Sequence, residues 1–326
     1  MSFHKNILDI DAEAETKRIV QILRDNVGKV MHRRGAVIGI SGGVDSSLVI
    51  ALCVRAFGAE RVVALLMPDK DSDPSSEILA RGVARHFGVD PILEDITPAL
   101  EGLGCYARRD AAIRRVFPDY DAAAGYKAKI VLPSNILDEG TLNIFSLTII
   151  TPSGEVITRR LDISEFLQIE AASNFKQRTR MSMLYYHAEQ RNYAVIGTPN
   201  RDEHEQGFFV KYGDGGADIR PIAHLYKTQV YQLAEYLGVP EDVRRRTPTT
   251  DTYSALQTQE EFFFRLPFAT MDLLCYAQEH ATPLTEVSAA LGLSEEQILR
   301  GYANLTQKKR ATNYLRMSPV EIDPLS

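Results

Sequence analysis

One short loop has the residue types and the spacing needed to hold a phosphate group. It consists of Gly39, Ile40, Ser41, Gly42, Gly43, Val44, Asp45 and Ser46. Two adjacent glycines let the backbone turn sharply and bring its N–H groups close to an anion. The two serines add hydroxyl donors, and the aspartate offers the hard oxygen ligand that Mg²⁺ prefers. The loop therefore predicts a site for the phosphates of a nucleotide.

The loop differs from the two commonest phosphate-binding patterns. It has no lysine, so it is not the GxxxxGK[ST] loop, and its glycines do not fit GxGxxG. The plain structural alternative is a glycine turn whose Asp45 only caps a helix. The position of the loop, directly between an apolar strand pattern and a helical pattern, favours phosphate binding.

The elements around the loop alternate between strand and helix patterns. Predicted strands cover 33–40, 61–68, 90–96 and 193–199, and predicted helices cover 12–33, 47–58, 75–89, 174–191 and 227–240. Short β-branched runs separated by helices predict right-handed crossovers and a parallel sheet. We therefore expect an α/β fold, a doubly wound parallel sheet with helices on both faces.

Residues 100–172 interrupt this alternation. They contain a hairpin pattern over 144–161 with a Pro-Ser-Gly turn, and we interpret them as a β-rich insertion, either a cover for the active site or an oligomer contact. Residues 255–326 are expected to be helical, with Ser294 as a helix cap. Because no linker is evident, residues 1–326 are expected to form a single domain.

Composition narrows the possible partners and the compartment. The chain has 326 residues and a formal net charge of −6, which argues against a nucleic-acid partner. Its three cysteines form no CxxC pair and suit a reducing compartment. No signal-peptide core and no run of about 18 apolar residues is present. We therefore expect a cytoplasmic protein without a membrane partner.

The glycine loop resembles the SGGxDS loop of the ATP pyrophosphatase (N-type) superfamily, which splits ATP between its α- and β-phosphates. That superfamily includes NAD, GMP, asparagine and argininosuccinate synthetases and tRNA-modifying enzymes. A second block at 197–227 reads GTPNRDEHEQGFFVKYGDGGADIRPIAHLYK. Together with the FKQRTRM run at 175–181, this block closely resembles the NAD synthetase family. The resemblance covers about residues 15–100 and 172–316 and implies an adenine nucleotide alpha hydrolase-like fold.

The resemblance implies an ammonia-dependent ligase that works in two steps. The nicotinate carboxylate of deamido-NAD attacks the α-phosphorus of ATP, which gives an adenylate and pyrophosphate. Ammonia then displaces AMP and leaves NAD. Only 35 residues precede the predicted Ala36 strand, too few for the glutaminase domain of glutamine-dependent relatives. Free ammonia, or ammonia from a separate protein, is therefore the expected nitrogen source.

Site residues follow from the same resemblance. Asp45 and Glu203 match the family's Mg²⁺ carboxylates, and Asp214, Lys227 and Asp45 are the expected catalytic residues. The expected ATP-binding residues are Gly39, Ser41, Gly42, Gly43, Asp45, Ser46, Thr198, Lys227 and Thr249. The expected deamido-NAD-binding residues are Arg178, Tyr185, Phe208, Lys211 and Asp218.

Each role has a chemical basis. Lysine is a point charge for phosphate, and a carboxylate at 214 would hold ammonium and take its proton. Arginine binds pyrophosphate through two parallel hydrogen bonds. Taken singly, most of these residues would be surface charges, core aromatics or turn formers. Their order in the chain favours the functional interpretation.

Two departures from the family pattern keep alternatives open. Where the family often reads TDExELG, residues 258–264 read TQEEFFF, so Gln259 replaces an expected Asp, aromatic residues follow, and Glu260 is carried over from the family pattern. The other departure is the insertion at 100–172. Both motivate a related amide ligase with another carboxylate substrate. An RNA-modifying enzyme and a non-catalytic nucleotide-binding protein are further alternatives. The resemblance also implies a homodimer.

Overall fold

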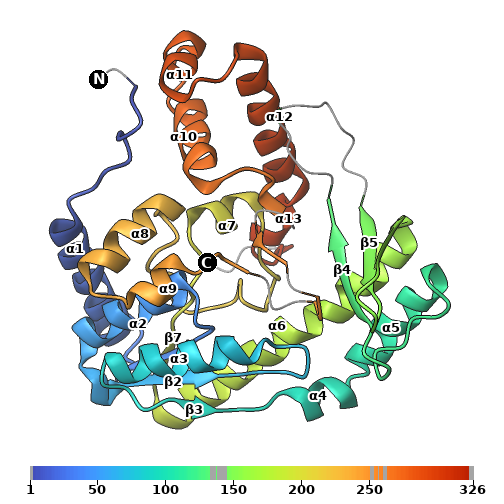
Figure 1. The fold of residues 1–326 in the computed structure, drawn as a ribbon. Coiled ribbons are helices and arrows are strands. Elements are labelled where there is room, and N and C mark those ends of the chain that lie inside the picture. The colour runs from blue at the N-terminus through green and yellow to red at the C-terminus, as the bar shows by residue number, and fades with distance from the viewer. Residues whose placement is uncertain are drawn as a thin grey trace.

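The computed structural model describes residues 3–132, 137, 145–249, 253–255, 257–259 and 263–322. Glu260 lies outside these residues. The described part of the chain contains two sheets (Figure 1). One is a parallel sheet packed between helices, and the other is an antiparallel sheet that lies beside it. A group of helices near the C-terminus lies over the parallel-sheet part, and the long helix α6 runs from the antiparallel sheet to the parallel sheet.

The parallel sheet confirms the predicted fold class. Its strand order is β3–β2–β1–β7. The strands are β1 (Ala36–Gly39), β2 (Val62–Leu66), β3 (Ile92–Leu93) and β7 (Ala194–Val195). In the register, Ala36 pairs with Val62 on one side and with Ala194 on the other. The strands are shorter than the apolar runs that predicted them, because the flanking residues continue as loops at the sheet edge.

Helices cover both faces of this sheet. The helices of this part of the chain are α1 (Ala12–Arg24), α2 (Val44–Phe57), α3 (Pro74–His86), α6 (Ile163–Arg191), α7 (Arg201–Gln206), α8 (Lys227–Tyr236) and α9 (Glu241–Arg245), with a π-helix η1 (Asp25–Val30) and a 3₁₀ turn η2 (Ala59–Arg61). Successive residues of a strand point to opposite faces. Accordingly, Ile38 belongs to a core with α1, α2, α3 and α8, whereas Val37 belongs to a core with Met181 and Leu184 of α6.

The antiparallel sheet confirms the predicted hairpin. Its strands are β4 (Lys127–Val131), β5 (Ser146–Ile150) and β6 (Val156–Arg160), in the order β4–β5–β6. Helices α4 (Thr97–Gly102) and α5 (Cys105–Val116) precede it, so the segment 100–172 contains more helix than its sequence suggested. The sheet packs on α5 and on the first half of α6 through a core that includes Ile113, Leu147 and Ile169.

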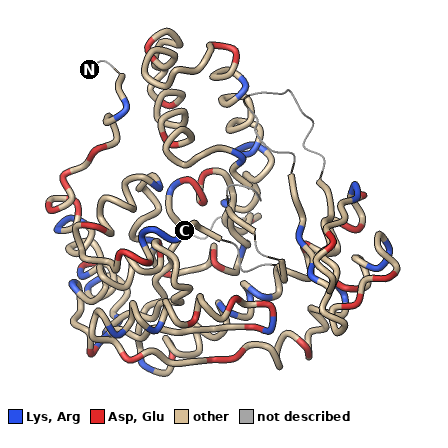
Figure 2. Tube along the Cα trace, viewed as in Figure 1, with Lys and Arg blue, Asp and Glu red and all other residues tan. Residues whose placement is uncertain are grey.

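The C-terminal part is helical where it is described. It contains α10 (Phe268–Glu279), α11 (Leu284–Leu291), α12 (Glu295–Ala311) and α13 (Asn313–Arg316). Ser294 caps α12 as predicted, because its hydroxyl accepts a hydrogen bond from the Gln297 N–H at 3.2 Å. Basic and acidic positions are interspersed along the trace (Figure 2). Within the described residues, every helix is too short or too polar to cross a bilayer.

Candidate active site

The glycine loop lies between the end of β1 and the start of α2, as the sequence predicted. Gly42 has φ +77°, and a Cβ at this position would lie 2.8 Å from the Ser76 carbonyl oxygen, so only glycine fits. The Ser46 hydroxyl donates to the Gly43 carbonyl at 3.1 Å. The Gly43 N–H in turn donates to the Ser41 hydroxyl at 3.3 Å. These bonds brace a compact loop at the N-terminus of α2, a position that favours anions.

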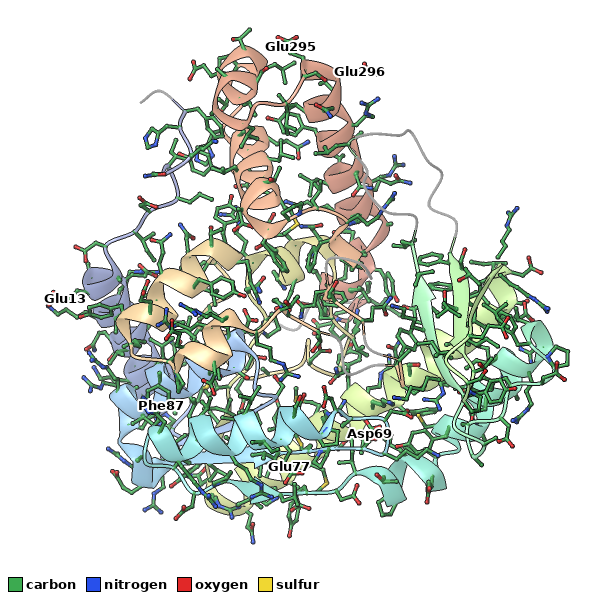
Figure 3. All side chains as sticks on the ribbon, in the orientation of Figure 1. Glu13, Asp69, Glu77, Phe87, Glu295 and Glu296 are labelled. Atoms are coloured by element: carbon green, nitrogen blue, oxygen red, sulfur yellow. The ribbon has the colours of Figure 1, made fainter. Side chains whose placement is uncertain are left out.

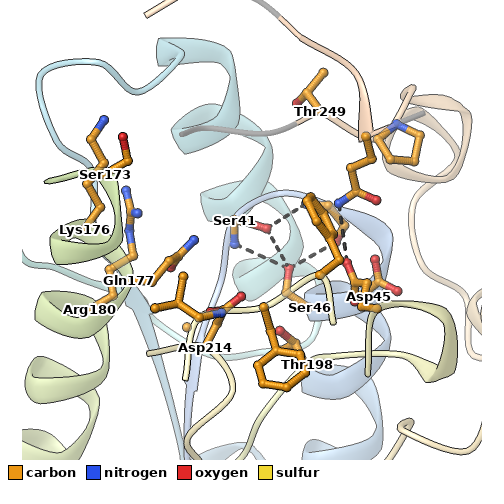
Figure 4. A pocket seen from close by; sticks show the side chains of 18 of the residues that line it. Ser41, Asp45, Ser46, Ser173, Lys176, Gln177, Arg180, Thr198, Asp214 and Thr249 are labelled. Atoms are coloured by element: carbon orange, nitrogen blue, oxygen red, sulfur yellow. Dashed lines mark hydrogen bonds between the residues drawn. The ribbon is translucent and has the colours of Figure 1, made fainter. Parts of the chain in front are cut away.

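A cavity of about 840 Å³ opens over this loop. That volume is in the range of ligand sites. Its lining includes all but one of the predicted ATP-binding residues: Gly39, Ser41, Gly43, Asp45, Ser46, Thr198, Lys227 and Thr249. Gly42 is absent from the lining because it packs against α3. Figure 4 shows side chains of α6 on one wall and Ser41, Asp45 and Ser46 on the wall across from it.

Asp45 and Lys227 form an ion pair at the base of this cavity. The Lys227 side chain is fully buried, and its ammonium contacts the Asp45 carboxylate. The Asn200 amide donates to the other carboxylate oxygen at 3.0 Å. Burial works against the charged lysine, but the carboxylates of Asp45 and Glu203 outweigh it and raise the pKa of Lys227. The lysine therefore stays protonated and ready to meet a phosphate oxygen.

Glu203 lies close to this pair, at the start of α7. It forms a capping box with Asn200, in which each side chain accepts the other residue's backbone N–H at 3.0 Å. Burial, followed by the charge of Asp45, raises the pKa of Glu203 to about 8. A cation between the two carboxylates would relieve this repulsion. The donor set therefore fits Mg²⁺, which takes one or two protein carboxylates and completes its shell with phosphates and water.

The described residues form no fuller metal cage around this pair of carboxylates. Within the described residues, no three His, Cys, Asp or Glu side chains converge as a cluster for a metal.

Asp214 also lines the cavity, on the loop that follows α7. One of its carboxylate oxygens accepts the Val210 N–H at 2.8 Å. Burial raises the pKa of Asp214 to about 6, although backbone N–H groups and the Arg180 charge oppose the shift. A carboxylate with this pKa is ionised at neutral pH and is basic enough to accept a proton, as a general base requires.

The predicted acceptor-binding residues divide into two groups. Arg178, Phe208 and Lys211 line the cavity. The Lys211 ammonium already donates to the carbonyls of Tyr314 at 2.9 Å and Met317 at 2.8 Å, so it ties the cavity wall to the C-terminal segment.

Tyr185 and Asp218 lie outside the cavity lining. The Tyr185 hydroxyl donates to Asp218 at 3.0 Å, and the second carboxylate oxygen of Asp218 accepts the Val195 N–H at 2.8 Å. The structure therefore brings these two residues together, but not with the others. Their role in binding deamido-NAD stays a prediction.

A buried charge cluster was missed by the sequence analysis. Lys176, which is 1% exposed, contacts Asp69 at 3.0 Å and Asp71 at 2.8 Å. Arg180 contacts Asp69 at 2.9 Å, and Arg109 of α5 contacts Asp71. Asp69 lies where the loop after β2 meets α6 (Figure 3). The available signal was a pair of aspartates at the carboxyl end of a parallel strand, a usual place for functional side chains.

A glycine loop at the carboxyl end of a parallel strand, with a cavity over it, defines an α/β nucleotide-binding protein. The family model described as NAD synthase matches residues 15–114 and 145–318. The chain belongs to the NAD synthase family. The match extends into the segment 100–172 from both sides and leaves 115–144 outside.

Curated relatives support the assignment over nearly the whole chain. An NH₃-dependent NAD⁺ synthetase of Mesorhizobium japonicum is 52% identical over 314 residues, which cover 96% of this chain and 98% of that protein. A protein of the same name from Rhizobium meliloti is 50% identical, covering 99% and 96%. The solved NH₃-dependent NAD synthetase of Campylobacter jejuni is 22% identical, with TM-score 0.63 and coverage of 97% and 100%, and it supports the fold.

Proposed function

We propose that this protein is an ammonia-dependent NAD synthetase, a ligase that uses ATP to convert the nicotinate carboxylate of deamido-NAD into an amide. The observation that carries this proposal is the juxtaposition of the Asp45–Lys227 pair with Glu203 at the phosphate loop. The matches to relatives named for this activity also support it, because they cover nearly the whole of both chains.

The first step activates the carboxylate. One carboxylate oxygen forms a bond to the α-phosphorus of ATP, the bond from that phosphorus to the bridging oxygen breaks, and pyrophosphate leaves. The glycine loop presents N–H groups and hydroxyls to the phosphates. Lys227 supplies a positive charge where negative charge accumulates on the departing oxygens. Mg²⁺, held by Asp45 and Glu203, would neutralise further phosphate charge.

The second step forms the amide. The nitrogen of ammonia bonds to the activated carbonyl carbon, the bond from that carbon to the AMP oxygen breaks, and one proton must leave the nitrogen. Ammonium is not a nucleophile, so it must lose a further proton before it attacks. Asp214 lines the cavity and has a pKa of about 6, which suits it for binding ammonium and accepting this proton.

The acceptor substrate would use the walls beside the loop. Arg178 and Phe208 offer a guanidinium for pyrophosphate and an aromatic face for the nicotinate ring. Tyr185 and Asp218 lie outside the cavity of one chain, and we propose that they contribute when two copies form a homodimer. Free ammonia as nitrogen donor and a cytoplasmic location belong to the same proposal.

A related amide ligase with another carboxylate substrate is the second candidate. The observation that favours it is the TQEEFFF segment at 258–264, which replaces an expected acidic pattern. The Gln259 amide lies 3.5 Å from a Glu203 carboxylate oxygen, so the altered segment contacts one of the two carboxylates proposed to hold Mg²⁺.

One assay separates the two candidates. The purified protein is incubated with ATP, Mg²⁺, ammonium chloride and deamido-NAD, and NAD, AMP and pyrophosphate are followed. NAD and AMP in equal amounts are expected. Folded protein that binds ATP and forms no NAD would refute the proposal and favour the second candidate.

A further inference from the structure

The first turn of α8 carries Lys227, and residues from two other helices hold its backbone. The first N–H groups of a helix have no partner within the helix and must find one outside it. The Lys227 N–H donates to the Asp202 carboxylate at 2.8 Å, and the Thr228 N–H donates to the Asp272 carboxylate at 2.8 Å. Asp202 belongs to α7 and Asp272 to α10. The start of α8 is therefore fixed from both α7 and α10.

This arrangement differs from an ordinary helix cap. The usual cap is a Ser, Thr, Asp or Asn directly before the helix, whose side chain accepts an N–H group of the first turn. Tyr226 occupies that position in α8, and its hydroxyl donates to Glu279 at 3.0 Å. The first two N–H groups of α8 therefore depend on distant parts of the chain, and their position is set by tertiary packing.

Both carboxyl groups are deeply buried. Asp202 is 2% exposed, and Asp272 is 0% exposed. Burial raises the pKa of Asp272 to about 6, so its ionised form costs stability at neutral pH. A neutral acceptor would satisfy the same N–H group at a lower cost. Local arrangements that lower stability are expected mainly at functional sites.

The Lys227 side chain extends from this fixed backbone to the base of the cavity. Its ammonium contacts Asp45 and lies 5.4 Å from the centroid of the Phe268 ring. Phe268 and Asp272 are four residues apart on α10, so both lie on the face that α10 presents to α8. A lysine side chain is long and flexible, so the position of its ammonium depends on where its backbone is held. Helix α10 therefore contacts both ends of this part of the site.

We propose that Asp202 and Asp272 are positioning residues, which hold Lys227 where its charge meets the departing pyrophosphate. This inference rests on the proposed function. Both carboxyl groups lie outside the lining of the cavity over the glycine loop, so they act through Lys227 and not on the substrate. Helix α10, from the C-terminal part of the chain, thereby supports the phosphate site across α8 (Figure 1).

The test compares two substitutions of Asp202 in the full-length enzyme. Asp202→Ala removes the acceptor of the Lys227 N–H, whereas Asp202→Asn keeps a carbonyl oxygen that can accept it. We expect Asp202→Ala to lower the kcat for pyrophosphate release about 10-fold or more, because a small displacement of a reacting group lowers the rate strongly. The KM for deamido-NAD should change less than about 2-fold. Asp202→Asn should restore most of the lost rate.

A double-mutant cycle shows whether Asp202 acts through Lys227. The rate of pyrophosphate release is measured for the wild type, Asp202→Ala, Lys227→Met and the double variant. If Asp202 positions Lys227, adding Asp202→Ala to Lys227→Met should lower the rate by less than about 2-fold, because the positioned group is already gone. A general structural role would lower the rate by the same factor in both backgrounds, and that result would overturn the proposal.

Asp11→Ala controls for the loss of a helix cap alone. Asp11 caps α1 by accepting the Ala14 N–H at 3.0 Å, and α1 lies outside the cavity lining. This variant should lower the thermal unfolding midpoint by a few degrees and leave kcat unchanged. If Asp202→Ala does not fold, the same comparison is made with Asp272→Ala and Asp272→Asn at the second bond. An unchanged kcat in the alanine variant, or a loss that asparagine does not restore, would overturn the positioning role.

Binding of pyrophosphate keeps this inference separate from the proposed function. Inorganic pyrophosphate with Mg²⁺ is titrated by calorimetry into the wild type, Asp202→Ala and Asp202→Asn. If the wild type forms no NAD, but it and Asp202→Asn bind pyrophosphate more tightly than Asp202→Ala, the proposed function fails and the positioning role stands. If the wild type forms NAD, and Asp202→Ala matches it in pyrophosphate affinity and kcat, the positioning role fails and the proposed function stands.

Discussion

The Lys227 ammonium at the start of α8 contacts the Asp45 carboxylate at the start of α2, although 182 residues separate them in the sequence. Both helices begin at the same edge of the parallel sheet, so their first turns converge on the cavity. The contact balances a buried positive charge against the carboxylate of the phosphate loop. Substrate phosphates and metal would enter a site in which both charges are already in position.

Removing the loop carboxylate should stop turnover. We expect Asp45→Asn to lower the kcat/KM for ATP by about 100-fold or more, because the metal loses a ligand and Lys227 loses its counter-charge. Release of pyrophosphate is the measurement. Asp73→Asn is the control, since Asp73 lines the same cavity, caps α3 and can be replaced as a cap by asparagine. Near-wild-type turnover by Asp45→Asn would remove Asp45 from the metal site.

The lysine of this pair should matter for both activity and stability. Lys227→Met leaves Asp45 without its cation and should reduce pyrophosphate release about 100-fold. It should also lower the free energy of unfolding by about 3 kcal/mol in urea titrations, as for a buried pair that loses one partner. The control, Lys17→Met, breaks the exposed pair with Glu13 and should leave the free energy of unfolding nearly unchanged. If Lys227→Met and Lys17→Met lost the same stability and activity, the role assigned to Lys227 would be contradicted.

Asp214 can be tested by separating the two half-reactions. Asp214→Asn should retain exchange between ATP and pyrophosphate in the presence of deamido-NAD, because the adenylation step does not need this carboxylate. Formation of NAD from ammonium should fall about 100-fold or more, as expected for a lost general base. In the wild type, the amidation rate should rise as the pH increases through about 6, where Asp214 ionises. If the variant performed both half-reactions normally, Asp214 would not handle ammonia.

The same carboxyl predicts a pH-dependent stability difference. Burial raises its pKa from 3.8 to about 6, so its contribution to stability is complete below about pH 4 and is lost as the pH rises through 6. At pH 8, Asp214→Asn should therefore unfold at a higher urea concentration than the wild type. Its free energy of unfolding should be larger by up to about 3 kcal/mol. At pH 4 the two should be equal. The exposed control Asp9→Asn should show no difference at either pH.

The buried charge cluster should be costly to break. Arg109→Met leaves Asp71 with one cation fewer and should reduce the free energy of unfolding by about 3 kcal/mol. Arg115→Met is a matched control on the same helix, where loss of the solvent-exposed pair with Glu165 should change the free energy of unfolding little. Urea unfolding followed by circular dichroism measures both. If Arg109→Met and Arg115→Met were equally stable, the buried charge cluster would not stabilise the packing of α5 against the loop after β2.

The sequence predicted the parallel sheet and its glycine loop because both depend on short segments. Apolar β-branched runs specify buried strands, and adjacent glycines specify a tight turn, without reference to distant residues. The order of motifs then predicted that Asp45, Glu203 and Lys227 would share one site. The structure places all three on one cavity, together with Asp214.

Other features depend on contacts that no local pattern encodes. The Lys176–Asp71 pair joins residues 105 positions apart, so neither residue alone indicates it. The first half of α6 was missed because one side packs on the antiparallel sheet and another lines the cavity, which blurs the helical pattern of apolar residues. Placement of Tyr185 against Asp218 likewise depends on how α6 lies across the sheet.

Helix α6 contains 29 residues without interruption, and Phe166 near its start and Lys176 and Arg180 farther along it all line the cavity. In a regular helix each residue turns the chain by about 100°. One residue added or removed between 166 and 176 would therefore rotate one end of the cavity lining away from the other. The number of residues in this stretch therefore determines which side chains face the cavity. We expect the stretch to tolerate substitutions far more readily than an insertion or a deletion.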